Sequence, residues 1–166
     1  MSVSTVVFAD LLREFTAVGC ANDCARFAML FTEDATYDDN FFGLHRGRGE
    51  IAAMLQRFHD TGENYRWEFD EPVFDGTLGY AWFRFSFASK MPGCEGKPVL
   101  IRGISCFRLE NGLIAEYREV FDTGIALAQL GFPGERIKRV LDKEAAAQNG
   151  SSAAREDLAR FHAHPR

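Results

Sequence analysis

The chain has 166 residues, of which 46% are hydrophobic, and this suits one compact domain with a core and a terminal extension. Its formal net charge of −5 disfavours nucleic acid or an anionic membrane as the main partner, because both bind positively charged protein surfaces. No apolar run approaches the ~20 residues that a membrane span needs, and the first residues lack a basic start. We therefore expect a soluble, cytoplasmic protein.

The cysteines and histidines give no metal signature. The four cysteines lack paired CxxC spacing, so they are expected to be reduced thiols: Cys20, Cys24, Cys94 and Cys106. A packed helix face explains the pair at 20 and 24 better than a disulfide or a metal does. His59, His162 and His164 have no carboxylate or thiolate at useful spacing. The sequence predicts neither a metal nor a cofactor.

The first third of the chain has helical periodicity. Apolar residues recur at helical spacing in residues 4–18, which predicts a helix with its apolar stripe on a sheet: Val3, Val6, Val7, Leu11 and Phe15. Asn22 is a candidate N-cap for a second helix ending at 32–34, and residues 50–59 form a third. Between them we expect a short strand at 35–39 and a glycine-containing loop at 40–48.

Beyond Gly62 the period changes to the alternation of strands. Residues 64–74 and 78–89 flank Asp75-Gly76, a hairpin signal. In the second strand one face is mixed (Tyr80, Trp82, Arg84 and Ser86) and the other is wholly apolar (Ala81, Phe83, Phe85 and Phe87). We assign the mixed face to a cavity and the phenylalanine row, with Ile104 and Val120, to an outer surface that is buried in a homodimer.

A second hairpin is predicted at 101–109 and 113–122, around Asn111-Gly112. Tyr117, Glu119 and Phe121 share one face of its last strand, which places a carboxylate between two aromatic rings. An unpaired charge in an apolar wall is disfavoured, so Glu119 is expected to lie in a cleft. A helical turn at 124–131, a helix at 135–148 and a polar tail complete the chain.

Several segments resemble the nuclear transport factor 2-like superfamily. The run FAMLFTEDATYDD is similar to its second helix and first strand, GLHRGRGEIAAML to its third helix, and GLIAEYREVFD to its last strand. The similarity is greatest to the SnoaL-like, polyketide cyclase-like branch and covers residues 4–131. It implies an α+β fold in which three helices pack in the concave face of a strongly curved antiparallel sheet, a cone-shaped barrel. Residues 1–131 would be that domain and 132–166 a helical extension.

The resemblance also implies site residues. Asp39 falls where ketosteroid isomerases have their general base, but Phe15 and Ser105 replace the two oxyanion-stabilising groups. Tyr37 and Arg84 match limonene epoxide hydrolases, with Glu119 in place of an aspartate, but Ser86 breaks their Asp-Arg-Asp arrangement. In SnoaL-like cyclases an acidic residue of the last strand transfers protons, and Glu119 matches it.

Each candidate residue also has a plain structural interpretation. Asp39 would be a base if burial raises its pKa, or else an acid that caps a loop. Arg84 and Glu119 would orient substrate, or form a structural ion pair. His45 would be a second acid–base group, or a solvated loop residue. The residues expected to line the cavity are Phe15, His45, Trp82, Ser86, Ser105, Tyr117 and Phe121.

The sequence thus favours a cofactor-free enzyme that uses acid–base catalysis on a hydrophobic small molecule, as an isomerase, cyclase, dehydratase or hydrolase. Asp39 would take a proton, Glu119 held by Arg84 would return one or position water, and Tyr37 would donate a hydrogen bond. The alternative is a non-catalytic ligand-binding or dimerisation module of the same fold.

Overall fold

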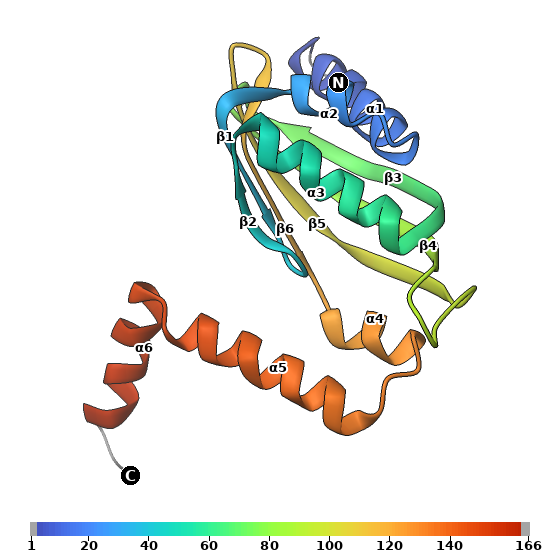
Figure 1. Cartoon of the computed structure of the whole chain (residues 1–166). Coiled ribbons are helices and arrows are strands. Elements are labelled where there is room, and N and C mark those ends of the chain that lie inside the picture. The colour runs from blue at the N-terminus through green and yellow to red at the C-terminus, as the bar shows by residue number, and fades with distance from the viewer. Residues whose placement is uncertain (1–2, 164–166) are drawn as a thin grey trace.

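A computed structural model describes residues 3–163 of the chain, and side chains from 6 to 160. Helices α1 (Val3–Cys20), α2 (Cys24–Met29) and α3 (Gly47–Thr61) lie against one face of a curved, open sheet (Figure 1). The six strands are β1 (Phe31–Asp39), β2 (Gly43–Arg46), β3 (Gly62–Phe74), β4 (Leu78–Ser89), β5 (Pro98–Glu110) and β6 (Leu113–Phe121). The expected α+β architecture, three N-terminal helices on a curved sheet, is confirmed.

The sheet order is β2-β1-β6-β5-β4-β3. All neighbours are antiparallel except β1 and β6, which run parallel. The two turn signals are used as predicted: Asn111 and Gly112 both have positive φ angles (51° and 81°), as a tight hairpin requires. In the other hairpin the Asp75 carboxylate accepts from the backbone N–H groups of Thr77 and Leu78, both at 2.8 Å.

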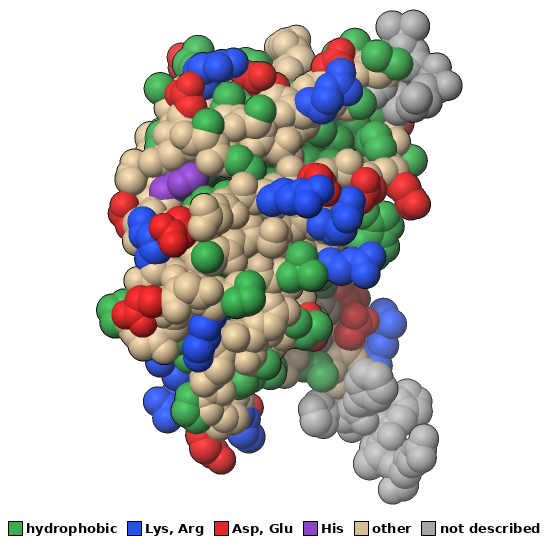
Figure 2. Space-filling model, turned by 90° about the vertical axis from the view of Figure 1, so that its right-hand side faces the viewer, with side chains coloured by type: hydrophobic (Ala, Val, Ile, Leu, Met, Phe, Trp, Pro, Cys, Tyr) green, Lys and Arg blue, Asp and Glu red, His purple; other side chains and the backbone are tan. Residues whose placement is uncertain are grey.

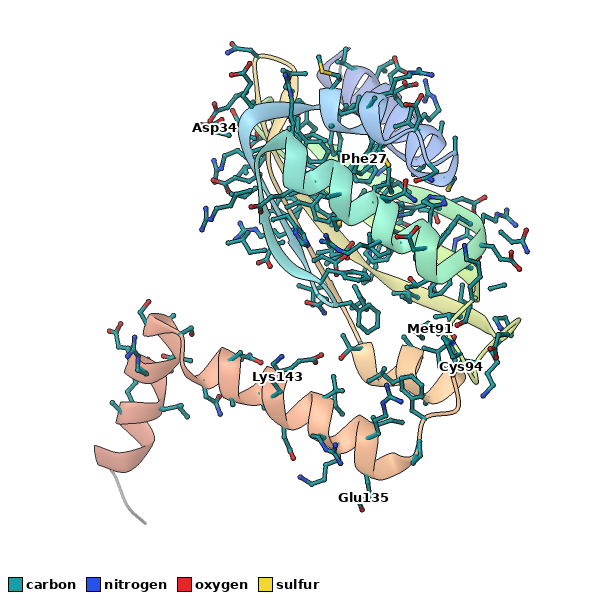
Figure 3. All side chains as sticks on the ribbon, viewed as in Figure 1. Phe27, Asp34, Met91, Cys94, Glu135 and Lys143 are labelled. Carbon is teal, nitrogen blue, oxygen red and sulfur yellow. The ribbon has the colours of Figure 1, made fainter. Side chains whose placement is uncertain are left out.

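The core lies between the sheet and the helices. Phe8, Leu12, Phe15 and Val18 are the buried residues of α1, whereas Val6 and Val7 are exposed. Of the predicted apolar stripe, Phe15 is buried and Leu11 is partly buried against the core, whereas Val6 and Val7 point to solvent; the side chain of Val3 lies outside the described residues. Phe27 of α2 points into this core and Asp34 points away from it (Figure 3).

The structure corrects several local predictions. Asp23, rather than Asn22, caps α2, because its carboxylate accepts from Arg26 N at 3.1 Å. The helix ends at Met29 and the strand begins at Phe31, since Ile114 N donates to Leu30 O and draws the chain into the sheet. The expected loop at 40–48 contains β2, and the expected polar tail contains a helix, α6 (Ser152–Ala163).

Two further helices follow the sheet. α4 (Thr123–Gln129) lies at one end of it, and α5 (Gly134–Asn149) then leads away with no buried residue (Figure 1). A hydrogen bond of 2.7 Å from Thr123 Oγ1 to Glu144 Oε2 ties α5 back to α4. Glu135, in the first turn of α5, points away from the sheet (Figure 3).

Within residues 3–163, none of the helices is long and apolar enough to cross a lipid bilayer. On the face drawn in Figure 2, acidic and basic side chains are interspersed, so this face carries no continuous basic surface. The phosphate groups of a nucleic acid would therefore find no matching patch there.

Candidate active site

A cavity of about 290 Å³ opens between the sheet, α3 and α4. Its wall is mainly aromatic and aliphatic, and it includes the phenylalanine row of β4: Phe83, Phe85 and Phe87. Three charged residues line it, namely Asp39, Glu119 and Arg136, and Tyr37, Thr61 and Tyr65 add hydroxyl groups. A mainly apolar hollow with a few polar groups is typical of sites for small organic molecules.

Asp39 reaches the cavity from the end of β1. Its side chain is only 3% exposed, and its Oδ1 accepts from the backbone N–H groups of Phe41 at 2.7 Å and Phe42 at 2.6 Å. Asp39 therefore caps the turn into β2 and lines the cavity at once. The same turn holds Phe41 and Phe42 at the cavity wall.

Glu119 comes to the same place from β6. In the parallel pairing of the two strands Tyr37 lies beside Tyr117 and Asp38 beside Arg118, so the next position brings Asp39 beside Glu119. Tyr117 Oη donates to Glu119 Oε2 at 2.7 Å and lies 2.9 Å from Ser105 Oγ. Ser105, Tyr117 and Glu119 thus form a buried hydrogen-bonded chain that ends at the cavity.

Burial shifts both carboxyl groups in the same direction. Desolvation raises the pKa of Asp39, although the two backbone hydrogen bonds, and smaller contributions from Glu119 and His45, oppose the rise. Desolvation raises the pKa of Glu119 well above its usual range, and the negative charge of Asp39 adds to the rise. Two neighbouring acids in a dry site do not both ionise easily, and the two backbone hydrogen bonds to Asp39 favour the ionised form of that acid.

The tyrosines beside the two acids are also held neutral. Burial and the nearby charge of Glu119 raise the pKa values of Tyr37 and Tyr117 well above their usual range. The two rings pack at 4.2 Å between centroids with their planes tilted by 33°, and neither side chain is more than 1% exposed. Tyr37 lines the cavity, and Tyr117 lies behind it as a donor to Glu119.

His45 is buried rather than solvated. It faces Tyr37 across the β1–β2 ladder, is 8% exposed and does not line the cavity. Its Nε2 and the indole Nε1 of Trp67 are buried without a hydrogen-bond partner among the described residues. His45 can therefore influence Asp39 through its charge, but it is not placed to touch a molecule in the cavity.

The prediction that Arg84 holds Glu119 is wrong. Arg84 lies on the other face of the sheet, with its side chain 49% exposed, where it pairs with Glu68 at 3.0 Å and Asp70 at 3.2 Å. Trp82 and Ser86 share that outer face and do not line the cavity, and Trp82 is 54% exposed. The two faces of β4 are the reverse of those predicted. Its apolar row faces the cavity because aromatic rings are more stable away from water, and its charged face is in solvent because ion pairs are more stable when hydrated.

Phe15 and Ser105 are buried but stand behind the cavity wall. The Phe15 ring packs in the core against Phe27, Trp67 and Tyr117. Phe121 does line the cavity, as predicted. Of the eleven predicted side chains, the structure therefore brings Tyr37, Asp39, Glu119 and Phe121 to the cavity.

Sequence reasoning missed much of the wall. The missed residues come from two consecutive elements and from one that is distant in sequence: Phe58 and Thr61 of α3, Tyr65 and Trp67 of β3, and Leu127 of α4. For β4 a signal existed, since its wholly apolar row was visible in the alternation. For Arg136 and Phe132, beyond the strands, no local pattern indicates a place in the wall.

Metal-binding residue types do not gather in this structure. Among the described residues, no three His, Cys, Asp or Glu side chains come close enough to hold a metal ion. All four cysteines are unpaired. His164 lies outside the described residues, and the side chain of His162 does too.

The fold has many solved counterparts. A protein of ketosteroid isomerase-like fold from Catenulispora acidiphila, solved with trimethylamine, has a TM-score of 0.68 and 20% identity over 75% of this chain and 95% of its own. An LEH-like epoxide hydrolase from M. tuberculosis has a TM-score of 0.64 and 16% identity over 76% of this chain and 91% of its own. A proposed polyketide cyclase from Xanthomonas campestris has a TM-score of 0.64 and 21% identity over 76% and 98%.

The sequence comparisons are more specific about the family than about the activity. No functionally curated protein matches the chain. The family model of the SnoaL-like domain matches residues 12–117, well over half of the chain and the part that contains Asp39 and most of the cavity wall. The chain therefore belongs to the SnoaL-like domain family.

Proposed function

We propose that this protein is an enzyme that moves a proton to or from the carbon beside a carbonyl group of a small, apolar molecule. The observation that carries the proposal is the pair of acids, Asp39 and Glu119, in one dry cavity. General acid–base catalysis needs groups whose pKa values lie near the working pH, and desolvation moves both carboxyl groups in that direction.

The two acids would have different roles. Asp39 accepts two backbone hydrogen bonds, which favour its ionised form, so it is the base. Glu119 keeps its proton and is the hydrogen-bond donor to the carbonyl oxygen. Tyr37 is a second donor at the cavity wall, and the chain from Ser105 through Tyr117 fixes the orientation of the Glu119 carboxyl group.

In the reaction, a carboxylate oxygen of Asp39 takes the proton from the carbon, and the C–H electron pair forms the double bond of an enolate. The carbonyl oxygen gains the negative charge, which the Glu119 carboxyl group stabilises by a hydrogen bond or by giving up its proton. Where a C=C bond is conjugated with the enolate, Asp39 returns its proton at the far carbon, which is an isomerisation. Alternatively the enolate attacks a second carbonyl carbon, whose oxygen takes the proton from Asp39, which is a cyclisation.

Proton transfer at carbon fits this site better than epoxide hydrolysis. The hydrolase precedent uses an arginine between two acids, and Arg84 lies outside the cavity. The only cation in the wall, among the described residues, is Arg136 in α5. The proposal accordingly favours an isomerase or a cyclase over a hydrolase.

We also propose a homodimer through the outer face of the sheet. Trp82, Ile104 and Val120 are direct cross-strand neighbours on β4, β5 and β6, and they are 54%, 38% and 67% exposed. A stable contact of this kind buries ~800 Å² per partner. Light scattering of the parent and of Val120→Glu tests this: a parent that is monomeric at micromolar concentration contradicts it.

The domain boundary belongs to the same proposal. Residues 1–131 would form the catalytic domain and 132–166 its extension, since the family match ends before the extension and α5 has no buried residue.

Deuterium exchange tests the proposed chemistry without knowledge of the natural substrate. A panel of small cyclic ketones is incubated in D₂O with the protein, and loss of the α-proton signals is followed by NMR. Asp39→Asn should slow the exchange by roughly 10² to 10⁴-fold. Asp38→Asn, the same change at the adjacent exposed position, is the matched control and should have a far smaller effect, since Asp38 only adds a minor charge contribution at Glu119. Binding of ketones without any exchange would contradict catalysis and favour the ligand-binding module.

A further inference from the structure

The cavity is electrically asymmetric. Asp39 and Glu119 are 3% and 9% exposed and lie in the depth of the site, whereas Arg136, the third charged residue of the wall, is an exposed residue in the first turn of α5. The rest of the wall is apolar or aromatic apart from three hydroxyl groups. A molecule in the cavity would therefore meet acids at one end and a cation at the other.

Arg136 is held in place without a counter-charge. Its guanidinium carbon lies 3.9 Å from the centre of the Phe132 ring, which also lines the cavity. Arg84 and Arg66 form ion pairs with carboxylates, but Arg136 lies within 4 Å of no carboxylate of the described residues. A guanidinium group stacked on a ring keeps the N–H groups of its edge free for a planar oxyanion.

We infer that the ligand is an apolar molecule of one or two rings that carries an oxyanion, most simply a carboxylate, at the end opposite its reacting carbonyl. The oxyanion binds Arg136 at the mouth, and the carbonyl end reaches Asp39 and Glu119. This inference rests on the proposed function for the identity of the reacting end. The volume of about 290 Å³ lies just below the roughly 300–1,000 Å³ that is typical of ligand pockets, and this limits the size of the apolar part of the ligand.

Repulsion supports the same orientation. An oxyanion placed beside Asp39 would face a second negative charge in a site with little water to screen it, which is strongly unfavourable. At Arg136 it would gain a charge-assisted hydrogen bond instead. Arg136 is thus a specificity-determining residue, and it lies outside the segment that matches the family model.

The test uses two probes that differ by one charged group. These are 1-anilinonaphthalene-8-sulfonate and N-phenyl-1-naphthylamine, which has the same rings without the sulfonate, and both fluoresce when they enter an apolar site. Arg136→Met keeps an apolar stem and removes the charge. Arg139→Met removes the same charge from an exposed position of α5 that does not line the cavity, so it is the matched control.

Arg136→Met should raise the dissociation constant of the sulfonate probe about threefold to tenfold. It should change the dissociation constant of the neutral probe by less than about twofold. Arg136→Lys should keep most of the preference, and Arg139→Met should change neither probe. The preference should also shrink as salt is raised, because an exposed charge is screened. Ala126→Phe, which places a ring in the cavity, should weaken both probes if they bind there.

Equal weakening of both probes by Arg136→Met would mean that Arg136 is only part of the wall, and an unchanged sulfonate affinity would mean that it makes no contact. Either result overturns the inference and leaves the proposed function intact, because the neutral probe still reports a usable cavity. If neither probe binds the parent protein, both this inference and the proposed ligand site are wrong. The loss of ketone exchange in Asp39→Asn is measured without the probes. The proposed function and the role of Arg136 can therefore be contradicted independently of each other.

Discussion

The two faces of the sheet each carry a pair of acids, and only their surroundings differ. On the outer face Glu68 and Asp70 flank Arg84 in water, with side chains 34% and 53% exposed. On the inner face Asp39 and Glu119 are buried among aromatic rings without a guanidinium group, and their pKa values are raised. The comparison teaches that desolvation, rather than the presence of carboxylates, makes a candidate for proton transfer.

The largest expected effect comes from breaking the inner pair. Glu119→Gln should lower ketone exchange by roughly 10²-fold or more, because the amide cannot give up a proton to the carbonyl oxygen. Combined with Asp39→Asn it should cost little more than the larger single change, since groups that act as a unit are not additive. Exchange rates of the four proteins by NMR measure this.

The control for that cycle is Glu68→Gln, the same substitution on the outer face, which should leave the exchange rate unchanged. Independent, fully additive losses at Asp39 and Glu119 would contradict a shared site.

The pH dependence of stability should also separate the two faces. A raised pKa means that the folded protein holds these protons at pH values where the unfolded chain has released them. The associated stability is fully present below the ordinary pKa of a carboxyl group and is lost as pH rises through the raised pKa values. Thermal melts from pH 5 to 9 should therefore show this loss in the parent, and Glu119→Gln should flatten it.

Starting the melts at pH 5 avoids the titration of acids whose pKa is lowered by folding, because these acids change the stability with pH in the opposite direction. Backbone hydrogen bonds lower the pKa of Asp75, so its stabilising contribution is lost only at more acidic pH. If the Tm of Glu119→Gln depends on pH in the same way as the Tm of the parent over this range, Glu119 titrates like a surface acid.

A smaller effect is expected from the group that orients Glu119. Tyr117→Phe removes the donor to Glu119 Oε2 and leaves Ser105 Oγ without this partner in a buried position. Losing such a bond costs roughly 1–3 kcal/mol of the free energy of unfolding, or about 2–4 °C in Tm for each kcal/mol. Tyr80→Phe, on the exposed outer face, is the matched change and should cost less.

The smallest effect is expected on the outer face itself. Arg84→Met removes two exposed ion pairs, which should cost less than about 1 kcal/mol in stability and nothing in exchange rate. A large loss of exchange in this variant, with an unchanged melting curve, would restore Arg84 to the mechanism and contradict the assignment of the faces.

The sequence was sufficient for most of the fold, because hairpin and helix signals are local. Asn111-Gly112 and Asp75-Gly76 place two hairpins, and β4 has its predicted bounds, Leu78–Ser89. The wrong step was the choice of face in β4, where a resemblance that put Arg84 beside Glu119 was preferred to the simpler rule that rings face the dry side. Side chains alternate between the two faces of a strand, so assigning Arg84 to the cavity face also assigned Trp82 and Ser86 to that face.

The candidate site was predictable only where strand alternation reaches it. Glu119 was found because it interrupts the aromatic alternation of β6, and Asp39 was placed by resemblance. The closing wall from α3, α4 and residues 132–136 depends on how distant segments pack, which periodicity does not encode. Among the residues that the structure describes, Arg136 is the one charged residue of the wall outside β1 and β6, and periodicity could not indicate it.

The most direct test of the central claim is a ¹³C NMR titration of the side-chain carboxyl carbons, with Asp39→Asn and Glu119→Gln used to assign the two buried signals. The account predicts that Glu119 stays protonated to a clearly higher pH than an ordinary glutamate, and that Asp39→Asn shifts the Glu119 titration back toward lower pH by removing the neighbouring charge. If Glu119 titrates near the ordinary pKa of a glutamate, Asp39 and Glu119 are not a desolvated acid–base pair, and the account is wrong.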